Sequence, residues 1–337
     1  MIEDPMNSRD AMPSGKQILI SAIVAAMAAL LAGASAAQTY PAKPIRLVIP
    51  FTAGSGPDLT GRLVAGAMSQ GLGQPVVAEN RVGAGGRIAA EFVARAAPDG
   101  YTLLLGTAST HMVSPHLVKD MPYDPFTSFT PISIAITPAT ALVVPASLPA
   151  RSMAELVDYA RANPGKIAFG SNGIGSSAHL VGELIKMAAG IEMLHVPFKG
   201  ANEVTTAMLS GQVQMQFSSP GATRAYVTGG KMKLLAILAS KRFAGAPELP
   251  TLTEALPGYE AVTDWFGFFA PASLPPPILS RLHGEIVRGL NTPELRAEFD
   301  KLTYIIVANT PEEFAALMKR EFQIYAKVIK TVNIPMQ

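Results

Sequence analysis

Short apolar, strand-like runs alternate with helix-like stretches from residue 45 onward, and this alternation constrains the fold more than any other feature. The run at 45–51 is closed by a loop of Gly, Ser and Pro, and 59–72 then has helical periodicity. Similar short runs follow at 75–78, 101–106, 167–170, 193–196, 213–217 and 234–239. Helical stretches separate most of them. The pattern predicts an α/β fold built from mainly parallel sheets that are buried on both faces and flanked by helices.

Three helix starts carry explicit capping signals. A Ser or Thr followed three residues later by Glu occurs at 152–155, 251–254 and 310–313. This spacing is typical of the capping box, in which two side chains bond the free backbone N–H groups of the first turn. The sequence therefore predicts helices that begin at these three places.

The first 37 residues have the pattern of an export signal. Lys16 precedes an apolar run at 18–31, and small residues follow at 34–37. The run is shorter than the roughly 20 residues that a bilayer span needs, and the small residues suit a signal-peptidase site. We therefore predict a signal peptide at 1–37 and a periplasmic location, with an N-terminal membrane anchor as the alternative.

Composition excludes several classes of function. Hydrophobic residues make up 49% of the chain and charged residues 15%, as expected for a globular protein with a large core. The net charge of +2 is too small for a nucleic-acid-binding surface. The chain has no cysteine, which excludes disulfides and thiolate metal sites, and its five histidines form no ligand cluster in the sequence. We expect no metal and no cofactor.

Two places suggest that the chain crosses between two lobes. The segment 137–140 interrupts two apolar runs, and 262–271 is an aromatic stretch that ends in a Pro-rich loop. Crossings at both would place residues 38–138 and 265–337 in one lobe and residues 139–264 in the other. A pair of crossings makes a natural hinge, because a few residues can absorb the rotation of one lobe against the other.

Loops rich in small polar residues follow several predicted strands. Carboxyl ends of strands are where open α/β sheets bind ligands. Glycine lets the backbone approach a ligand, and the free N–H groups and dipole of a helix start favour anions. The candidate ligand-binding residues in these loops are Thr52, Ala53, Gly54, Ser55, Gly56, Asp58, Thr107, Ser109, Ser171, Asn172, Ser176, Ser177, His179, Lys199, Gly200, Ala201 and Ser218.

Each of these loops also has a simpler interpretation. Small polar residues precede helices because they cap the helix's own N–H groups. Asp58 is expected to fix the first loop or cap its helix rather than act as a base. His179 and His195 are expected to be structural hydrogen-bonding groups rather than acid–base groups. Five such loops together nevertheless favour a ligand-binding cleft.

Signatures of catalysis are missing from the sequence. It has no G-x-S-x-G, no H-E-x-x-H, no Walker loop and no G-x-G-x-x-G after a strand. We therefore expect a protein that is not an enzyme. The remaining enzymatic alternative is an exported serine hydrolase using His179 or His195, which would need a Ser–His hydrogen bond and a third orienting group.

The mature chain carries a series of short motifs at 40–46, 50–51, 73–77, 79–81, 83–86, 97–103, 122–125, 163–166, 176–180, 195–200, 211–214, 265–267, 270–271 and 310–314. The order of these motifs resembles that of the Bug family, the periplasmic solute-binding proteins of tripartite tricarboxylate transporters. The sequence departs from the family pattern in the first loop and at 218–220, where family members bind ligands.

The resemblance implies a two-lobed periplasmic-binding-protein fold that closes over a small ligand, often a carboxylate. It also implies ligand contacts from 52–57 and 171–177. We therefore expect a monomeric receptor that captures a small, carboxylate-bearing metabolite for membrane transporter subunits. A ligand sensor that signals to a membrane partner is the alternative within the same fold.

Overall fold

The computed structural model describes residues 40–198, 200–239, 241–334 and 336. Residues Lys43–Gln337 form one compact unit. The predicted signal peptide lies outside the described residues. In the part of the chain that is described, no helix is both long and apolar enough to cross a membrane.

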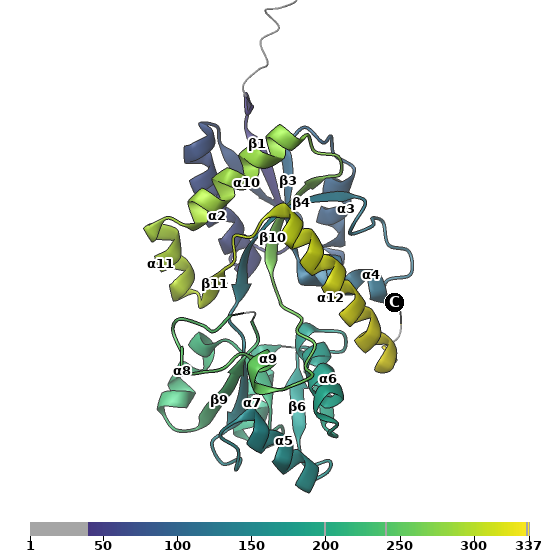
Figure 1. The fold of residues 1–337 in the computed structure, drawn as a ribbon, viewed down its shortest axis with the longest axis vertical. Coiled ribbons are helices and arrows are strands. Elements are labelled where there is room, and N and C mark those ends of the chain that lie inside the picture. The colour runs from purple at the N-terminus through teal and green to yellow at the C-terminus, as the bar shows by residue number, and fades with distance from the viewer. Residues whose placement is uncertain (1–39, 199, 240, 335, 337) are drawn as a thin grey trace, which may run out of the picture. The chain divides into compact units, whose positions relative to one another are not determined.

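A six-stranded sheet organises the first lobe of this unit (Figure 1). Its strand order is β11-β4-β10-β3-β1-β2. The strands are β1 (Ile45–Ile49), β2 (Val76–Asn80), β3 (Thr102–Thr107), β4 (Phe129–Pro138), β10 (Phe266–Pro271) and β11 (Tyr304–Ile306). The helical elements around it are α2 (Gly56–Leu72), η1 (Ala84–Gly86), α3 (Arg87–Ala94), η2 (Ser109–Val113), α4 (Ser114–Leu117), α10 (Pro276–Leu290), α11 (Pro293–Lys301) and α12 (Pro311–Thr331).

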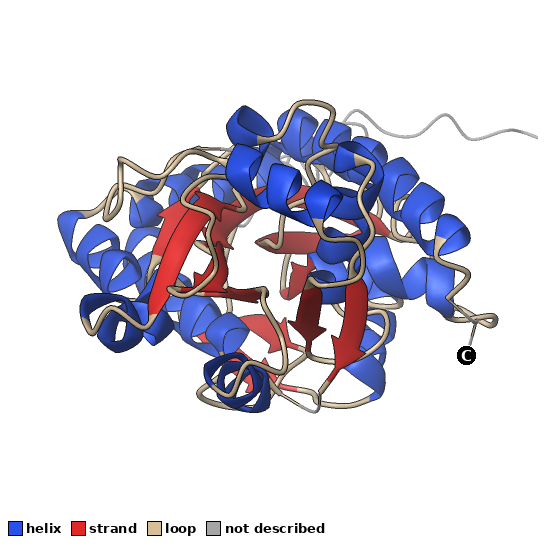
Figure 2. Ribbon diagram, turned by 90° about the horizontal axis from the view of Figure 1, so that it is seen from below, coloured by secondary structure: helices blue, strands red, loops and turns tan. Residues whose placement is uncertain are grey.

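Two smaller sheets organise the second lobe. One has the order β8-β5-β9 and the other pairs β6 with β7. The strands are β5 (Ala141–Pro145), β6 (Ala168–Ser171), β7 (Leu194–Pro197), β8 (Gln216–Ser218) and β9 (Met232–Ile237). The helices are α5 (Met153–Ala162), α6 (Ser177–Ala189), α7 (Ala201–Leu209), α8 (Pro220–Thr228) and α9 (Leu252–Ala255). Helices lie around the strands in both lobes (Figure 2).

The expected two-lobed α/β fold is confirmed, but its strand directions are more mixed than the sequence suggested. β1 pairs in parallel with β2 and β3, and β6 pairs in parallel with β7. By contrast, β10 runs antiparallel to β3 and β4, and β5 runs antiparallel to β8 and β9. β4 leaves the first lobe and β10 returns to it, so these two neighbours run in opposite directions.

The chain passes between the two sets of sheets at two segments. β4 ends at Pro138 in the large sheet, and β5 begins at Ala141 in a small one. The second passage precedes β10. The strands thus fall on either side of the predicted boundaries at 138–139 and 264–265, while the exact lobe limits remain a prediction.

Two of the three predicted capping boxes are complete. The Thr251 and Thr310 side chains each accept a hydrogen bond from the third residue of their helices, whose Glu side chain bonds back. At the third start, Ser152 accepts from the Glu155 N–H, but the Glu155 carboxylate accepts from the Arg151 N–H instead. That helix therefore has the cap but not the reciprocal bond.

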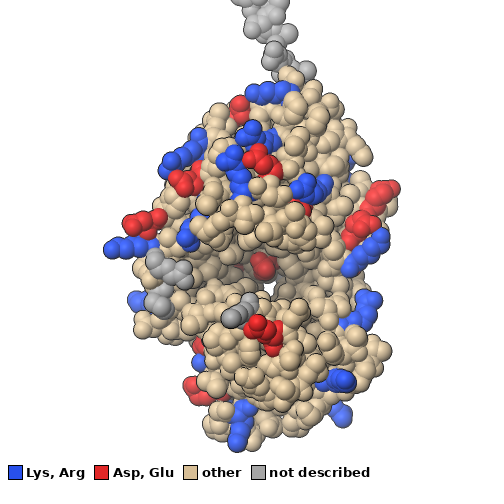
Figure 3. Space-filling model, turned by 180° about the vertical axis from the view of Figure 1, so that it is seen from behind, with Lys and Arg blue, Asp and Glu red and all other residues tan. Residues whose placement is uncertain are grey.

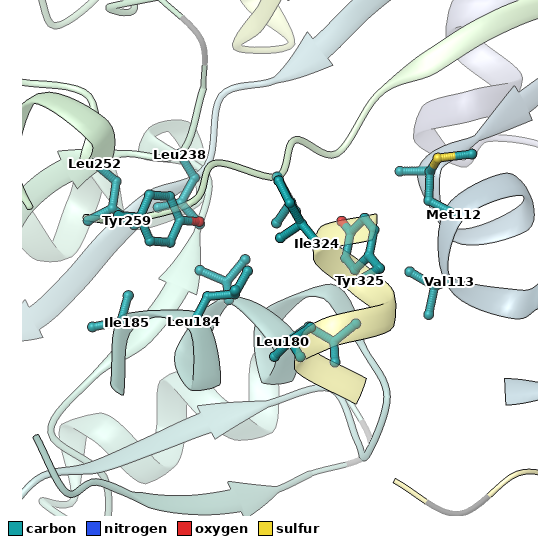
Figure 4. Close-up of a cluster of buried hydrophobic side chains, with 14 of the residues drawn as sticks. Met112, Val113, Leu180, Leu184, Ile185, Leu238, Leu252, Tyr259, Ile324 and Tyr325 are labelled. Carbon is teal, nitrogen blue, oxygen red and sulfur yellow. The ribbon is translucent and has the colours of Figure 1, made fainter. Parts of the chain in front are cut away.

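One apolar core runs through both lobes along α12. Figure 4 shows Leu180 and Leu184 of α6 gathered with Ile324 and Tyr325 of α12 in a single buried cluster. Tyr325 is 1% exposed, so this packing excludes water. The α6–α12 contact therefore joins the two lobes.

Candidate functional site

A pocket of about 320 Å³ lies at the strand ends of the second lobe, and the molecular surface is visibly hollowed in Figure 3. A larger hollow of about 730 Å³ lies at the opposite end of β5, beside Pro145 and Lys231, and none of the predicted site residues lines it. The smaller pocket is lined by Thr140, Asn172, Ser177, Ala178, Val181, Ala201, Phe217, Ser218, Ser219, Ala222, Leu238, Val262 and Asp264.

Three helices begin at this pocket. Ser177 and Ala201 are the first residues of α6 and α7, and Ala222 lies in the first turn of α8. Each helix start presents backbone N–H groups and a partial positive charge. Three of them at one pocket favour a negatively charged group of a ligand without any basic side chain.

The three helix starts differ in how they are capped. Ser176 caps α6 by accepting from the His179 N–H, and Ser219 caps α8 by accepting from the Ala222 N–H. Gly200, the N-cap of α7, has no side-chain acceptor for the N–H groups of the first turn. The Glu203 N–H at the same position of α7 donates to the Gly200 carbonyl instead, so the N–H of the third residue is bonded in all three helices.

Four of the predicted site residues line the pocket together: Asn172, Ser177, Ala201 and Ser218. Asn172 follows β6, and Ser218 ends β8. Asn172 and Ser177 are exposed, and Ser218 is partly so. Their polar groups can therefore turn toward a bound molecule.

Other predicted residues of the same loop hold the loop itself. The Ser171 hydroxyl lies 2.6 Å from His195 Nε2 and also accepts from the Gly173 N–H. The Ser176 hydroxyl donates to the Gly173 carbonyl at 2.7 Å. Ser171 is 1% exposed, so it is closed off from a ligand.

The two histidines of this lobe stack on each other. The rings of His179 and His195 lie 3.9 Å apart, and His179 Nδ1 accepts from the Gly175 N–H at 3.1 Å. Burial lowers the pKa of His179, although Glu183 opposes this, and burial lowers the pKa of His195 to about 4. Both rings are therefore neutral at pH 7 and shape the loop 171–179.

The loop after β1 is fixed by Asp58. Its carboxylate, 3% exposed, accepts from the Gly54 N–H, from Arg62 Nε and from Asn80 Nδ2, at 2.7 to 3.0 Å. Asn80 in turn donates to the Phe51 carbonyl. Burial alone would raise the pKa of Asp58, but these hydrogen bonds lower it overall. The Asp58 carboxylate therefore binds groups of the protein itself rather than a ligand.

The end of the loop after β1 lies against β11 and not at the pocket of the second lobe. A Cβ at Gly56 would lie 2.4 Å from the Tyr304 hydroxyl, so the loop approaches that ring closely. Thr52, Ala53 and Gly54 are exposed, and the Ser55 hydroxyl is buried without a protein partner. None of these predicted residues lines the pocket of the second lobe.

The loop after β3 also satisfies its own polar groups. The Thr107 hydroxyl accepts from the Thr110 N–H at 3.3 Å, and the Thr110 hydroxyl donates to the Thr107 carbonyl at 2.9 Å. Thr107 is 2% exposed, whereas Ser109 is exposed beside it. Neither lines the pocket, and Lys199 lies outside the described residues.

Asp264 was not among the residues predicted from the sequence. It lines the pocket from the segment that leads into β10. Burial raises the pKa of Asp264 to about 6, although the Trp265 backbone N–H lowers it. Its negative charge also adds to the rise in the pKa of Tyr304 that burial causes. A lone carboxylate within the aromatic run 262–271 was the signal that could have identified it.

The residues on either side of Asp264 are tied to α12. The buried Glu321 carboxylate accepts from the Thr263 N–H and hydroxyl at 2.9 and 2.7 Å and from Trp265 Nε1 at 3.0 Å. Burial raises the pKa of Glu321 to about 7, although these donors lower it. Glu321 therefore fixes the segment that presents Asp264.

Comparison with known proteins points to one family. The model of the family described as "Tripartite tricarboxylate transporter family receptor" matches residues 60–334. Protein BugT of Bordetella pertussis is 33% identical to this chain, over 89% of the chain and 92% of its own length.

Two solved structures are similar over most of the chain. MatC from Rhodopseudomonas palustris, solved with bound malate, is 30% identical, with a TM-score of 0.65, and the match covers 86% of this chain and 100% of that one. A second R. palustris protein, solved with adipate, is 34% identical, with a TM-score of 0.68, and the match covers 88% of this chain and 100% of that one.

Proposed function

Since this chain belongs to the tripartite tricarboxylate transporter family of receptors, as its motifs predicted, we propose that it captures a small carboxylate-bearing metabolite and presents it to membrane transporter subunits. The binding site is the pocket of the second lobe. Two similar proteins were solved with malate and with adipate, which supports a carboxylate ligand.

The observation that carries this proposal is the meeting of three helix starts at the pocket. The first turns of α6, α7 and α8 all line the pocket, and the hydroxyls of Ser177 and Ser218 add donors. Fixed donors of this kind stabilise an anion without the cost of ordering a long basic side chain.

Closure of the first lobe completes the site. Tyr304 and Gly56 approach each other in that lobe, and the Asp264 charge acts on Tyr304. A ligand that contacts both lobes stabilises the closed state, because only there are all its contacts made. The segments at 139–140 and 262–265 act as the hinge, and Glu321 keeps the second segment attached to α12.

A thermal-shift screen tests the proposal. Malate, adipate, other mono-, di- and tricarboxylates, amino acids and aromatic acids are added to purified protein, and at least one acid is expected to raise the melting temperature. Ser177→Leu, which fills the pocket, should abolish that shift. The matched control Ser147→Leu, in the larger hollow, should keep it. Stabilisation by no acid, or an equal shift in Ser177→Leu, would refute the proposal.

We propose further that the protein performs no reaction on its ligand. The hydrogen-bonded Ser171 and His195 have the contact that a hydrolase requires, but Ser171 is buried and bonded to its own loop. Incubation of the bound acid with the protein, followed by NMR of the mixture, should return the acid unchanged.

Export and oligomeric state have direct tests. The signal peptide at 1–37 predicts that protein recovered from the periplasm begins near residue 38, which N-terminal sequencing checks. A monomer is expected by light scattering, both with and without ligand.

A further inference from the structure

Asp264 is the one ionisable side chain among the described residues that line the pocket. The other polar groups there are the hydroxyls of Thr140, Ser177, Ser218 and Ser219 and the amide of Asn172. No described Lys, Arg or His lines the pocket to balance Asp264. The pocket therefore joins a negative side chain to helix starts that attract negative charge.

The direction of the Asp264 side chain is set by its neighbours. Val262 and Asp264 line the pocket, while Thr263 and Trp265 are bonded to the buried Glu321 on the other side. Alternation of this kind is what an extended segment produces, because successive side chains point to opposite sides. Turning Asp264 away from the pocket would break the bonds that hold Thr263 and Trp265.

These two features make different demands on a ligand. The helix starts favour a carboxylate, whereas Asp264 repels one and attracts a donor or a positive charge. A ligand with negative charge alone would leave Asp264 facing like charge in a confined pocket, which disfavours binding. A ligand with one group of each sign satisfies both ends.

We propose that the ligand carries an ammonium group as well as a carboxylate, and that Asp264 binds the ammonium group. The inference rests on the proposed receptor function and names the chemical class of its ligand as an amino acid. Asp264 then acts as the residue that separates amino acids from the plain acids of the same length.

Matched pairs of compounds test this by calorimetry at pH 7.5. The pairs are L-aspartate and succinate, L-glutamate and glutarate, 4-aminobutanoate and butanoate, and 5-aminopentanoate and pentanoate. Within each pair an ammonium group replaces one hydrogen atom. In the wild-type protein, the amino compound of at least one pair should bind about tenfold or more tightly than its partner, as expected for a charge-assisted hydrogen bond.

Variants assign that preference to Asp264. Asp264→Asn should reduce the preference to about twofold or less, largely by weakening the amino compound. Glu260→Gln, four residues earlier in the chain, removes one negative charge from an exposed ion pair with Lys327, and it should keep the preference. If Asp264→Asn does not fold, the binding of the matched compounds to the wild-type protein still tests whether the ligand needs an ammonium group.

The outcomes separate the two proposals. Equal or tighter binding of the plain acids by wild-type protein overturns the role of Asp264 but keeps the carboxylate receptor. A preference that persists in Asp264→Asn also overturns it. Binding of none of the eight compounds would overturn the receptor proposal for these acids and this inference with it.

Discussion

The loop after β1 and the loop after β6 have similar compositions but use their polar groups differently. In the first, the buried Asp58 carboxylate binds the Gly54 N–H, Arg62 and Asn80 in one partly buried network. In the second, Ser171 and Ser176 bond their own loop, while Asn172 and Ser177 stay exposed at the pocket. Glycine and hydroxyl content therefore marks a strand-end loop without telling whether its donors remain available.

The same contrast occurs within four residues of the second crossing. Thr263 and Trp265 are bonded to Glu321, and Asp264 between them lines the pocket. A polar group can bind a ligand only if the protein has not already bonded it. The two regions therefore differ in whether their polar groups are already hydrogen-bonded within the protein. Three experiments test this difference.

Removal of the Asp58 carboxylate has the largest expected effect. Asp58→Ala leaves three donors without their acceptor and should lower the free energy of unfolding by about 3 kcal/mol. Urea denaturation measures the loss. Asp120→Ala, at an exposed aspartate, should change the free energy of unfolding by less than about 0.5 kcal/mol. A cost below about 1 kcal/mol for Asp58→Ala would show that the first loop does not depend on this network.

Glu321 makes stability depend on pH. Its pKa is about 7 in the folded protein against 4.5 for the free group, so the unfolded chain releases this proton first as pH rises. Stability is therefore greatest below pH 4.5 with respect to this group and falls as pH rises through 7, by about 3 kcal/mol. Asp264 has a raised pKa of about 6, so it too lowers the stability as pH rises.

Glu321→Gln should remove the part of this dependence that Glu321 contributes and leave the part from Asp264, because the amide does not titrate. Urea denaturation from pH 4.5 to pH 7.5 measures it, with the exposed Glu294→Gln as the matched control that keeps the slope. An equal slope in Glu321→Gln would show that the bonds to Thr263 and Trp265 leave its carboxylate ionised throughout.

The adjacent serines at the start of α6 have the smallest expected effect and give the sharpest contrast. Ser176→Ala removes the helix cap and should cost about 1 kcal/mol of stability. Ser177→Ala should cost less than about 0.5 kcal/mol but weaken ligand binding about threefold or more. Thermal unfolding and calorimetry measure the two quantities. A reversed order of the stability losses would place the free hydroxyl at Ser176 instead.

Much of the fold followed from local patterns. The alternation of strand and helix periods predicted the α/β class, and the spacing of Thr and Glu predicted the starts of α9 and α12. These signals are local, because caps and periodicity involve residues only a few positions apart. The direction of β10 could not be predicted in this way, since it depends on which strand the chain meets on returning from the second lobe.

The candidate site was predictable only in part. Asn172, Ser177, Ala201 and Ser218 line the pocket, while Thr107 and Asp58 bond their own lobe. Asp264 was missed because it lies in an apolar run and not in a polar loop. Its position became meaningful once the structure placed it beside the starts of helices far away in the sequence.

The sequence by itself determined the α/β class, the starts of α9 and α12, and which family the motifs belong to. Only the tertiary structure decided which polar groups are consumed by distant partners and which face the pocket. The physical reason is that a hydrogen bond such as that between Glu321 and Trp265 joins residues 56 positions apart, and no local pattern specifies it.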